Sequence, residues 1–163
     1  LNIFYKILAL FGCMVLQTSF LRPLAISGVK PDFILIGTAF FALEEGEFGG
    51  AVLGFSAGLF MDILGGGAPG ANTLIMLFIG FLSGLSKRMF FSEKLGIQML
   101  IVFFLCMLDG MLNTLFFPAM GGNDAMDRIT LPLALYTAFA APFCFVFFRK
   151  AKKALILKPF AEK

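Results

Sequence analysis

Three glycines and one aspartate recur at every fourth position in the first half of the chain, as Gly50, Gly54, Gly58 and Asp62. On an α-helix this spacing sets all four along one face, which then carries few side chains. In lipid, helices associate through close van der Waals contact, and small residues at this spacing let two backbones approach. The spacing therefore predicts a tightly packed membrane helix, whose neighbour is either another helix of this chain or a partner's helix.

The composition agrees with a membrane setting. Hydrophobic residues make up 60% of the 163 residues and charged residues 14%, whereas soluble domains have about 45–50% apolar residues. The chain has no His, the commonest general base and metal ligand. Cys13, Cys106 and Cys144 lie far apart in apolar runs, without metal-ligand spacing. We therefore expect an integral membrane protein that is not an enzyme, has no cofactor or metal, and does not bind nucleic acid.

Six apolar segments predict an all-α, polytopic bundle of six transmembrane helices in a single domain. They cover residues 3–20, 31–43, 48–64, 71–85, 95–117 and 129–148, and a basic tail follows over residues 149–163. Polar connections are expected over residues 21–30, 86–94 and 119–128. Pro132 is expected in the first turn of the last segment, and Pro142 is expected to kink it.

The second segment is unusually short. Pro31 is expected at the first helical position and Asp32 in the first turn, where its charge meets the helix dipole. The segment would cover about 20 Å, against a hydrocarbon core of about 30 Å. A re-entrant hairpin is the alternative, but its tip would bring three acids into the membrane without matching bases nearby. Full crossing with local thinning of the bilayer is therefore preferred.

Several polar residues lie within or at the ends of the apolar segments. An Asp at the bilayer centre costs about 2.5–3.5 kcal/mol, so Asp62 is expected to be shallow or paired. It caps a helix end, pairs with Arg22 or Lys30, or binds a partner or ligand. Asp32 is either a cap or a site residue. Asp109 and Asn113 lie one turn apart and are predicted to form a hydrogen-bonded pair between helices.

The basic residues predict the orientation of the bundle. With both termini in the cytoplasm, ten of the thirteen Lys and Arg residues face inward, as the positive-inside rule requires. Lys6 is expected to extend to the lipid headgroups. The four bases that follow the last segment are predicted to anchor it and to contact anionic lipid; they are Arg149, Lys150, Lys152 and Lys153. In this orientation Asp32, Asp62 and Asp109 all lie in the outer half of the membrane.

The central hairpin resembles the MreD family of bacterial rod-shape-determining membrane proteins. The resemblance rests on Pro31-Asp32 opening an apolar helix, an acidic turn with glycine, and then Gly50, Gly54, Phe55, Gly58, Leu59 and Asp62 in order. It implies a multi-pass protein of the bacterial cytoplasmic membrane that has no enzymatic activity and serves the cell-elongation machinery. It also implies MreC as partner, with MreB, RodA and a class B penicillin-binding protein nearby, and a fold similar to the S-components of energy-coupling-factor transporters.

Two functions follow as hypotheses. In the first, the chain is a scaffold that binds the single transmembrane helix of an MreC-like protein. That helix is expected on one of two small-residue faces, Gly50 to Gly58 or Gly80 with Gly84. In the second, Asp32, Asp62 and Asp109 line a pocket for a small molecule, as in an S-component. The spans contain no Trp or His and few amides for such a pocket, so the scaffold is preferred.

Overall fold

The computed structural model describes residues 3–20, 31–65, 69–89, 95–116 and 123–157, and the regular elements in these ranges are helices. In chain order they are α1 (Ile3–Phe20), α2 (Phe33–Glu45), α3 (Glu47–Gly65), α4 (Ala71–Met89), α5 (Leu95–Phe116) and α6 (Asn123–Leu157). The prediction of an all-α protein is confirmed. Most residues of the predicted connections lie outside the described ranges.

Three of these helices contain a stretch long and apolar enough to cross a membrane. The stretches are Glu47–Leu64 in α3, Gly96–Leu115 in α5 and Thr130–Lys150 in α6. Shorter apolar stretches occur in α1 (Lys6–Val15) and α4 (Ala71–Lys87). The three long stretches agree with the expected membrane protein, whereas crossing by all six helices stays a prediction.

The short helix α2 occupies the centre of the bundle. It contacts each of the other five helices, and every residue from Ile34 to Ala42 is buried. A helix that is apolar on all sides is stable where protein surrounds it. Because its sides are covered by other helices rather than by lipid, α2 does not need to match the thickness of the bilayer.

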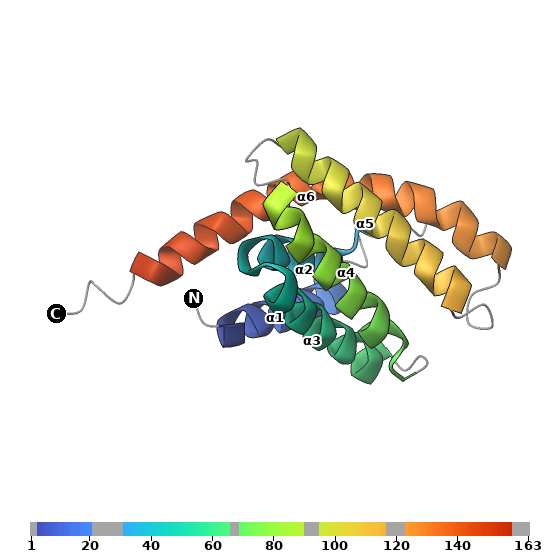
Figure 1. Cartoon of the computed structure of the whole chain (residues 1–163), viewed down its shortest axis with the longest axis horizontal. Helices are drawn as coiled ribbons and strands as arrows, with labels where there is room; N and C mark the ends of the chain where they lie inside the picture. Colours follow the sequence, from blue (N-terminus) through green and yellow to red (C-terminus); the bar gives the residue numbers. More distant parts are fainter. Residues whose placement is uncertain (1–2, 21–30, 66–68, 90–94, 117–122, 158–163) are drawn as a thin grey trace.

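The other helices pair around α2 (Figure 1). The most extensive contact joins α3 to α4, and the next joins α5 to α6. In contrast, within the described ranges α1 has backbone contacts with α2 and α3 alone. The polar ends of the central helix therefore face side chains from several different helices.

The last helix differs from its predicted bounds. It runs from Asn123 to Leu157 instead of from 129 to 148, so Pro132 lies well inside it rather than in its first turn. A proline removes one backbone hydrogen bond, a loss that membrane helices tolerate where neighbours satisfy the freed groups. Beyond residue 148 the helix continues through the first part of the basic tail, whose Lys, Ala and Leu residues are strong helix formers.

Candidate functional site

The glycine face of α3 is packed directly against the backbone of α4. A Cβ added to Gly54 would overlap the carbonyl oxygen of Met76 and lie 3.2 Å from the Cα of Gly80. A Cβ on Gly50 would overlap the carbonyl of Gly80, and one on Gly58 would overlap that of Asn72. The small residues therefore serve the contact between two helices of this chain.

The second small-residue pair lies on the other side of the same contact. A Cβ on Gly80 would overlap the carbonyl of Gly50, and one on Gly84 would overlap the carbonyl of Gly46. Gly46 has φ 97°, a conformation that favours glycine, and forms the corner between α2 and α3. Of the two neighbours expected for these glycines, a helix of this chain is the one observed, because α3 and α4 fill each other's faces.

Asp62 holds the N-terminal end of α4. Its carboxylate accepts hydrogen bonds from the backbone N–H groups of Gly70 (3.0 Å), Asn72 (3.1 Å) and Thr73 (3.0 Å). The Asn72 amide and the Thr73 hydroxyl also donate to it. Of the interpretations of Asp62, capping of a helix end is therefore the one observed; Arg22 and Lys30 lie outside the described residues. Asn72, in the first turn of α4, is one of the donors to Asp62.

Asp32 caps the N-terminal end of α2. It lies just before the helix and accepts hydrogen bonds from the N–H groups of Ile34 and Leu35, both at 3.0 Å. Pro31 therefore precedes the cap. The prediction that Pro31 is the first helical residue is wrong. The position before the cap suits proline, because the fixed backbone angle of proline is compatible with the extended chain there.

Two further side chains at this end of α2 were not identified from the sequence. The Gln17 side-chain oxygen of α1 accepts from the N–H groups of Phe33 (3.1 Å) and Ile34 (3.2 Å). The Thr137 hydroxyl of α6 accepts from the Asp32 N–H at 3.2 Å. Gln17 begins a short polar run with Thr18 and Ser19, and Thr137 lies far away in an apolar run, so nothing in their spacing indicates a shared partner.

The opposite end of α2 carries an ion-pair cluster. Lys6 of α1 is only 3% exposed, and its Nζ lies 3.1 Å from Glu44 Oε2 and 2.5 Å from Glu45 Oε1. Lys87 of α4 donates to the carbonyl oxygen of Glu44, near the end of the helix. The prediction that Lys6 extends to the headgroups is wrong, and the acidic corner does have matching bases. The hydrogen bond from Lys6 holds the pKa of Glu45 below its ordinary value.

Asp109 and Asn113 do not form a pair between helices. The Asn113 amide donates to the backbone carbonyl of Asp109 at 3.0 Å, within α5. The half-buried carboxylate of Asp109 lies close enough to that of Asp32 for their charges to interact. Among the three predicted outer acids, Asp32 and Asp109 thus approach each other, whereas Asp62 is engaged at the end of α4.

The bases of the tail continue along α6. Arg149 is half-buried and Lys150 is exposed, both at the end of the long apolar stretch. Lys152 and Lys153 belong to the helix, and their side chains lie outside the described part of the chain. Their contact with anionic lipid stays a prediction.

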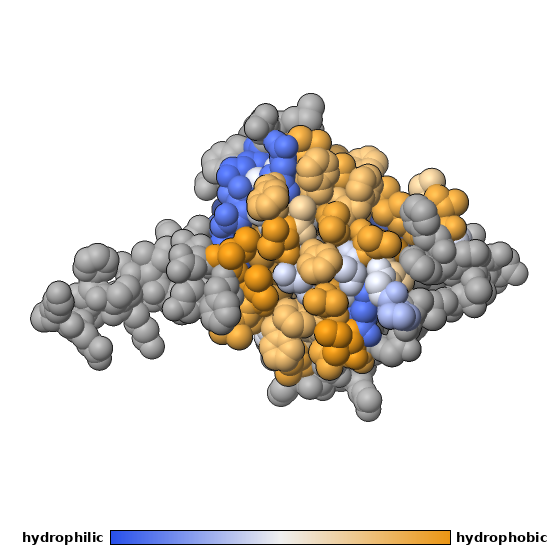
Figure 2. Space-filling view, turned by 60° about the horizontal axis from the view of Figure 1, so that its bottom comes forward, coloured by the Kyte–Doolittle hydropathy of each residue, from blue (hydrophilic) through white to orange (hydrophobic). Residues whose placement is uncertain are grey.

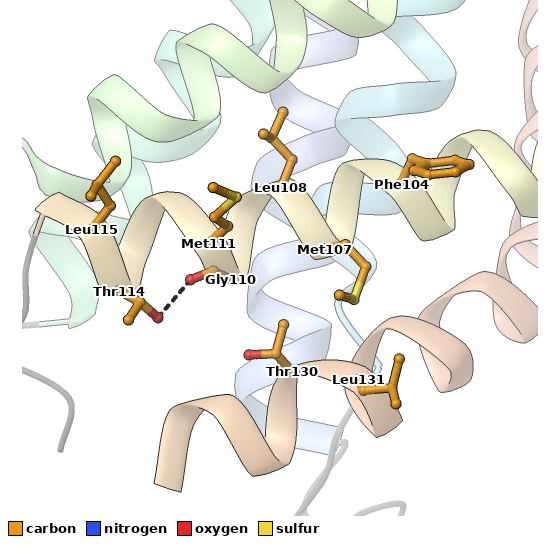
Figure 3. Close-up of a pocket in the computed structure, with 9 residues that line it drawn as sticks. All are labelled: Phe104, Met107, Leu108, Gly110, Met111, Thr114, Leu115, Thr130 and Leu131. Carbon is orange, nitrogen blue, oxygen red and sulfur yellow. Dashed lines mark hydrogen bonds between the residues drawn. The ribbon is translucent and has the colours of Figure 1, made fainter. Parts of the chain in front are cut away.

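A groove of about 690 Å³ lies between α5 and α6 (Figure 3). Its lining residues are Phe104, Met107, Leu108, Gly110, Met111, Thr114, Leu115, Thr130 and Leu131. The Thr114 hydroxyl donates to the Gly110 carbonyl of its own helix at 2.9 Å, so it is not free for a ligand. Within the described ranges, no group of three or more Cys, Asp or Glu side chains has the geometry to hold a metal ion. The groove is therefore an apolar surface with little capacity for polar recognition.

Comparison with protein families identifies the chain. The family model described as rod shape-determining protein MreD matches residues 1–153. The chain belongs to the MreD family. It is accordingly a bacterial membrane protein of the machinery that determines rod shape, and the three long apolar helices fit this location. Comparison with curated proteins found no significant match, and comparison with solved structures found none either.

The MreD family resemblance seen in the sequence is thereby confirmed over most of the chain. Most of the residues that carry the resemblance join helices, whereas Phe55 and Leu59 are exposed. Pro31 and Asp32 begin α2, the glycines pack α3 on α4, and Asp62 caps α4. The MreD signature in this chain thus has a structural role that follows directly from its contacts.

Proposed function

We propose that the protein is a non-enzymatic subunit of the bacterial cell-elongation complex that binds MreC and supports the localisation of peptidoglycan synthesis. MreB, RodA and a class B penicillin-binding protein are the other proposed members. Family membership supports the assignment to rod-shape determination. The observation that carries the scaffold role is that the polar residues of the signature are engaged in contacts between helices.

The contacts at the two ends of α2 support this role. Gln17, Asp32 and Thr137 bind the N-terminal end, while Lys87 binds a carbonyl at the other end. Since lipid offers no water to hydrogen-bond exposed backbone groups, such caps are what a helix bundle needs in a membrane. A rigid bundle in which both ends of the central helix are capped by other helices suits a docking platform.

We further propose that all six helices cross the membrane with both termini in the cytoplasm. Lys6, Lys87 and the α2–α3 corner lie at one end of the bundle, as this orientation requires for the inner side. Asp62 lies at the opposite end of α3. Arg149 and Lys150 follow the α6 stretch and would act there as anchors to anionic lipid, together with residues 152 and 153.

A partner helix then needs a surface other than the glycine faces. The groove between α5 and α6 is the surface to test first, because its walls are apolar and the large side chains of Met111 and Leu115 are exposed there. An S-component-like role in small-molecule binding draws less support. Asp62 and Asp32, two of the three acids proposed for that pocket, already accept several hydrogen bonds each.

Purification of the tagged chain from its native membrane, followed by mass spectrometry of the eluate, tests the proposal. We expect a single-span MreC-like protein in a fixed ratio to the chain, and loss of that protein on Met111→Trp in the groove. The matched control is Leu74→Trp, an equally exposed position on α4. A stoichiometric small molecule without any such protein would contradict the proposed function.

A further inference from the structure

Two polar layers bound the part of the bundle that α1, α3 and α4 form. One layer contains Lys6, Glu44, Glu45 and Lys87, which join the start of α1 to the α2–α3 corner and to the end of α4. The other contains Asp62 with its donors on α4, and Gln17 near the end of α1. Polar contacts therefore lie near both ends of α1 and α4, and α3 runs from the corner in the first layer to Asp62 in the second.

The layers are closer together than the two surfaces of an average bilayer. Glu47 and Asp62 are fifteen positions apart on α3, which is about 23 Å at 1.5 Å per residue. Thr73 and Lys87 are about 21 Å apart along α4, and Lys6 and Gln17 about 17 Å along α1. The hydrocarbon core of a typical bilayer is about 30 Å thick, and helix tilt only shortens these spans further.

The surface between the layers is apolar and faces outward. Its exposed side chains are Phe11 and Val15 on α1, Phe55 and Leu59 on α3, and Phe78 and Phe81 on α4. Figure 2 shows an orange face with hydrophilic residues gathered at two opposite edges. This surface is a hydrophobic band that lies mainly between the two layers, and on α3 the exposed Ile63 and Leu64 extend it by less than one turn past Asp62.

The layers are held in place and cannot easily adapt. Lys6 is buried and bound to two carboxylates, so it is not free to extend toward distant headgroups. The Asp62 carboxylate is held by three backbone amides. The apolar stretch Glu47–Leu64 of α3 reaches about 26 Å, somewhat less than the stretches Gly96–Leu115 of α5 and Thr130–Lys150 of α6, which reach about 29 and 30 Å.

We propose that the α1–α3–α4 surface binds bilayer of reduced thickness, so that the protein thins the membrane along this side and is most stable among short acyl chains. The inference rests on the six crossings proposed above. The apolar spans between the layers are shorter than the hydrocarbon core of the bilayer. Because the protein's polar layers are fixed, the lipid deforms to match them. The partner of this surface is thus lipid of short chain length.

Reconstitution of the full chain in phosphatidylcholine vesicles tests the inference. Vesicles with monounsaturated chains of fourteen to twenty-two carbons keep the headgroup constant while the thickness changes. We expect the thermal unfolding midpoint to be highest at fourteen to sixteen carbons and to fall by about 5 °C toward the longest chains. A maximum at eighteen carbons or more, or an unchanged midpoint across the series, would overturn the inference.

A matched pair of variants tests the edge of the band in the fourteen-carbon vesicles. Ile63→Lys adds a charge just beyond Asp62, and Leu59→Lys adds it one turn inside; both positions are exposed. We expect Ile63→Lys to keep the wild-type midpoint and Leu59→Lys to lower it. Equal losses would overturn the inference. Retention of the MreC-like partner is measured separately, so a failed lipid preference leaves the proposed function standing.

Discussion

The Asp62 carboxylate accepts five hydrogen bonds, three from backbone amides and two from side chains. The sequence identifies Asp62 as the exceptional residue of its helix, because an acid in an apolar segment needs a partner. It does not identify the partners, which lie across a turn of Gly and Pro whose path the spacing leaves open. Gln17 and Thr137 are missed for a related reason, since polar residues far apart in the sequence form a cluster only through the fold.

Two fully buried threonines test how much a hydrogen-bond partner for a buried hydroxyl contributes to stability. Thr137 accepts a hydrogen bond from the Asp32 N–H, whereas in the described part of the structure the Thr38 hydroxyl has no partner. Thr38→Val removes an unsatisfied hydroxyl and should stabilise the protein by up to about 1 kcal/mol. Thr137→Val leaves the backbone N–H of Asp32 without its acceptor and should lower the free energy of unfolding by about 1–2 kcal/mol. Thermal unfolding in detergent measures both, and the reverse order would contradict the account.

The ion pair of Glu45 predicts a pH dependence. Its pKa is lowered in the folded protein, chiefly by the hydrogen bond from Lys6, so the carboxylate contributes stability above its ordinary pKa. That contribution decreases as the pH falls through the lowered pKa. Wild type should unfold about 1–2 °C above Glu45→Gln at pH 7, and the two midpoints should converge as the pH falls through the lowered pKa of Glu45. A difference that persists unchanged in acid would exclude the ion pair as its source.

The contact between α3 and α4 is the clearest case in which an element was predicted and its neighbour was not. Glycines at every fourth position predict a close approach, and both helices are found where expected to within a few residues. The physics of close approach is the same for a helix of this chain and for a partner's helix. For this reason the spacing predicts the contact without identifying the helix that makes it.

Single alanine substitutions test this contact. In Gly54→Ala the new methyl group overlaps the α4 backbone, which cannot rotate away as a side chain can, so we expect a loss of about 2 kcal/mol or more. Gly12→Ala on α1 is the control, since a Cβ there meets nothing within 4 Å and alanine favours the helix by about 0.5–1 kcal/mol. Unfolding midpoints of the two variants give the comparison. Equal stability of both variants would contradict the tight contact.

At the scale of the whole molecule, hydropathy predicts the helical class and the approximate positions of all six helices. It does not predict that α2 is enclosed by the others, because a short apolar run is equally compatible with a thinned membrane. Nor does it predict the length of α6, whose basic end continues the helix beyond the apolar stretch. Among the proposed site residues, Asp32, Asp62 and the glycines join helices of this chain. The proposed partner surface therefore lies elsewhere on the bundle.

The most direct test of this account is the retention of the MreC-like partner by an Asp62→Asn variant that is still folded. The substitution removes the charge that caps α4 and should lower the unfolding midpoint, so the purification is done in the cold and folding is verified by circular dichroism. We predict that the folded variant retains the partner in the wild-type ratio, because Asp62 acts within the bundle. Loss of the partner from a demonstrably folded Asp62→Asn protein would contradict the account and assign the signature to the interface.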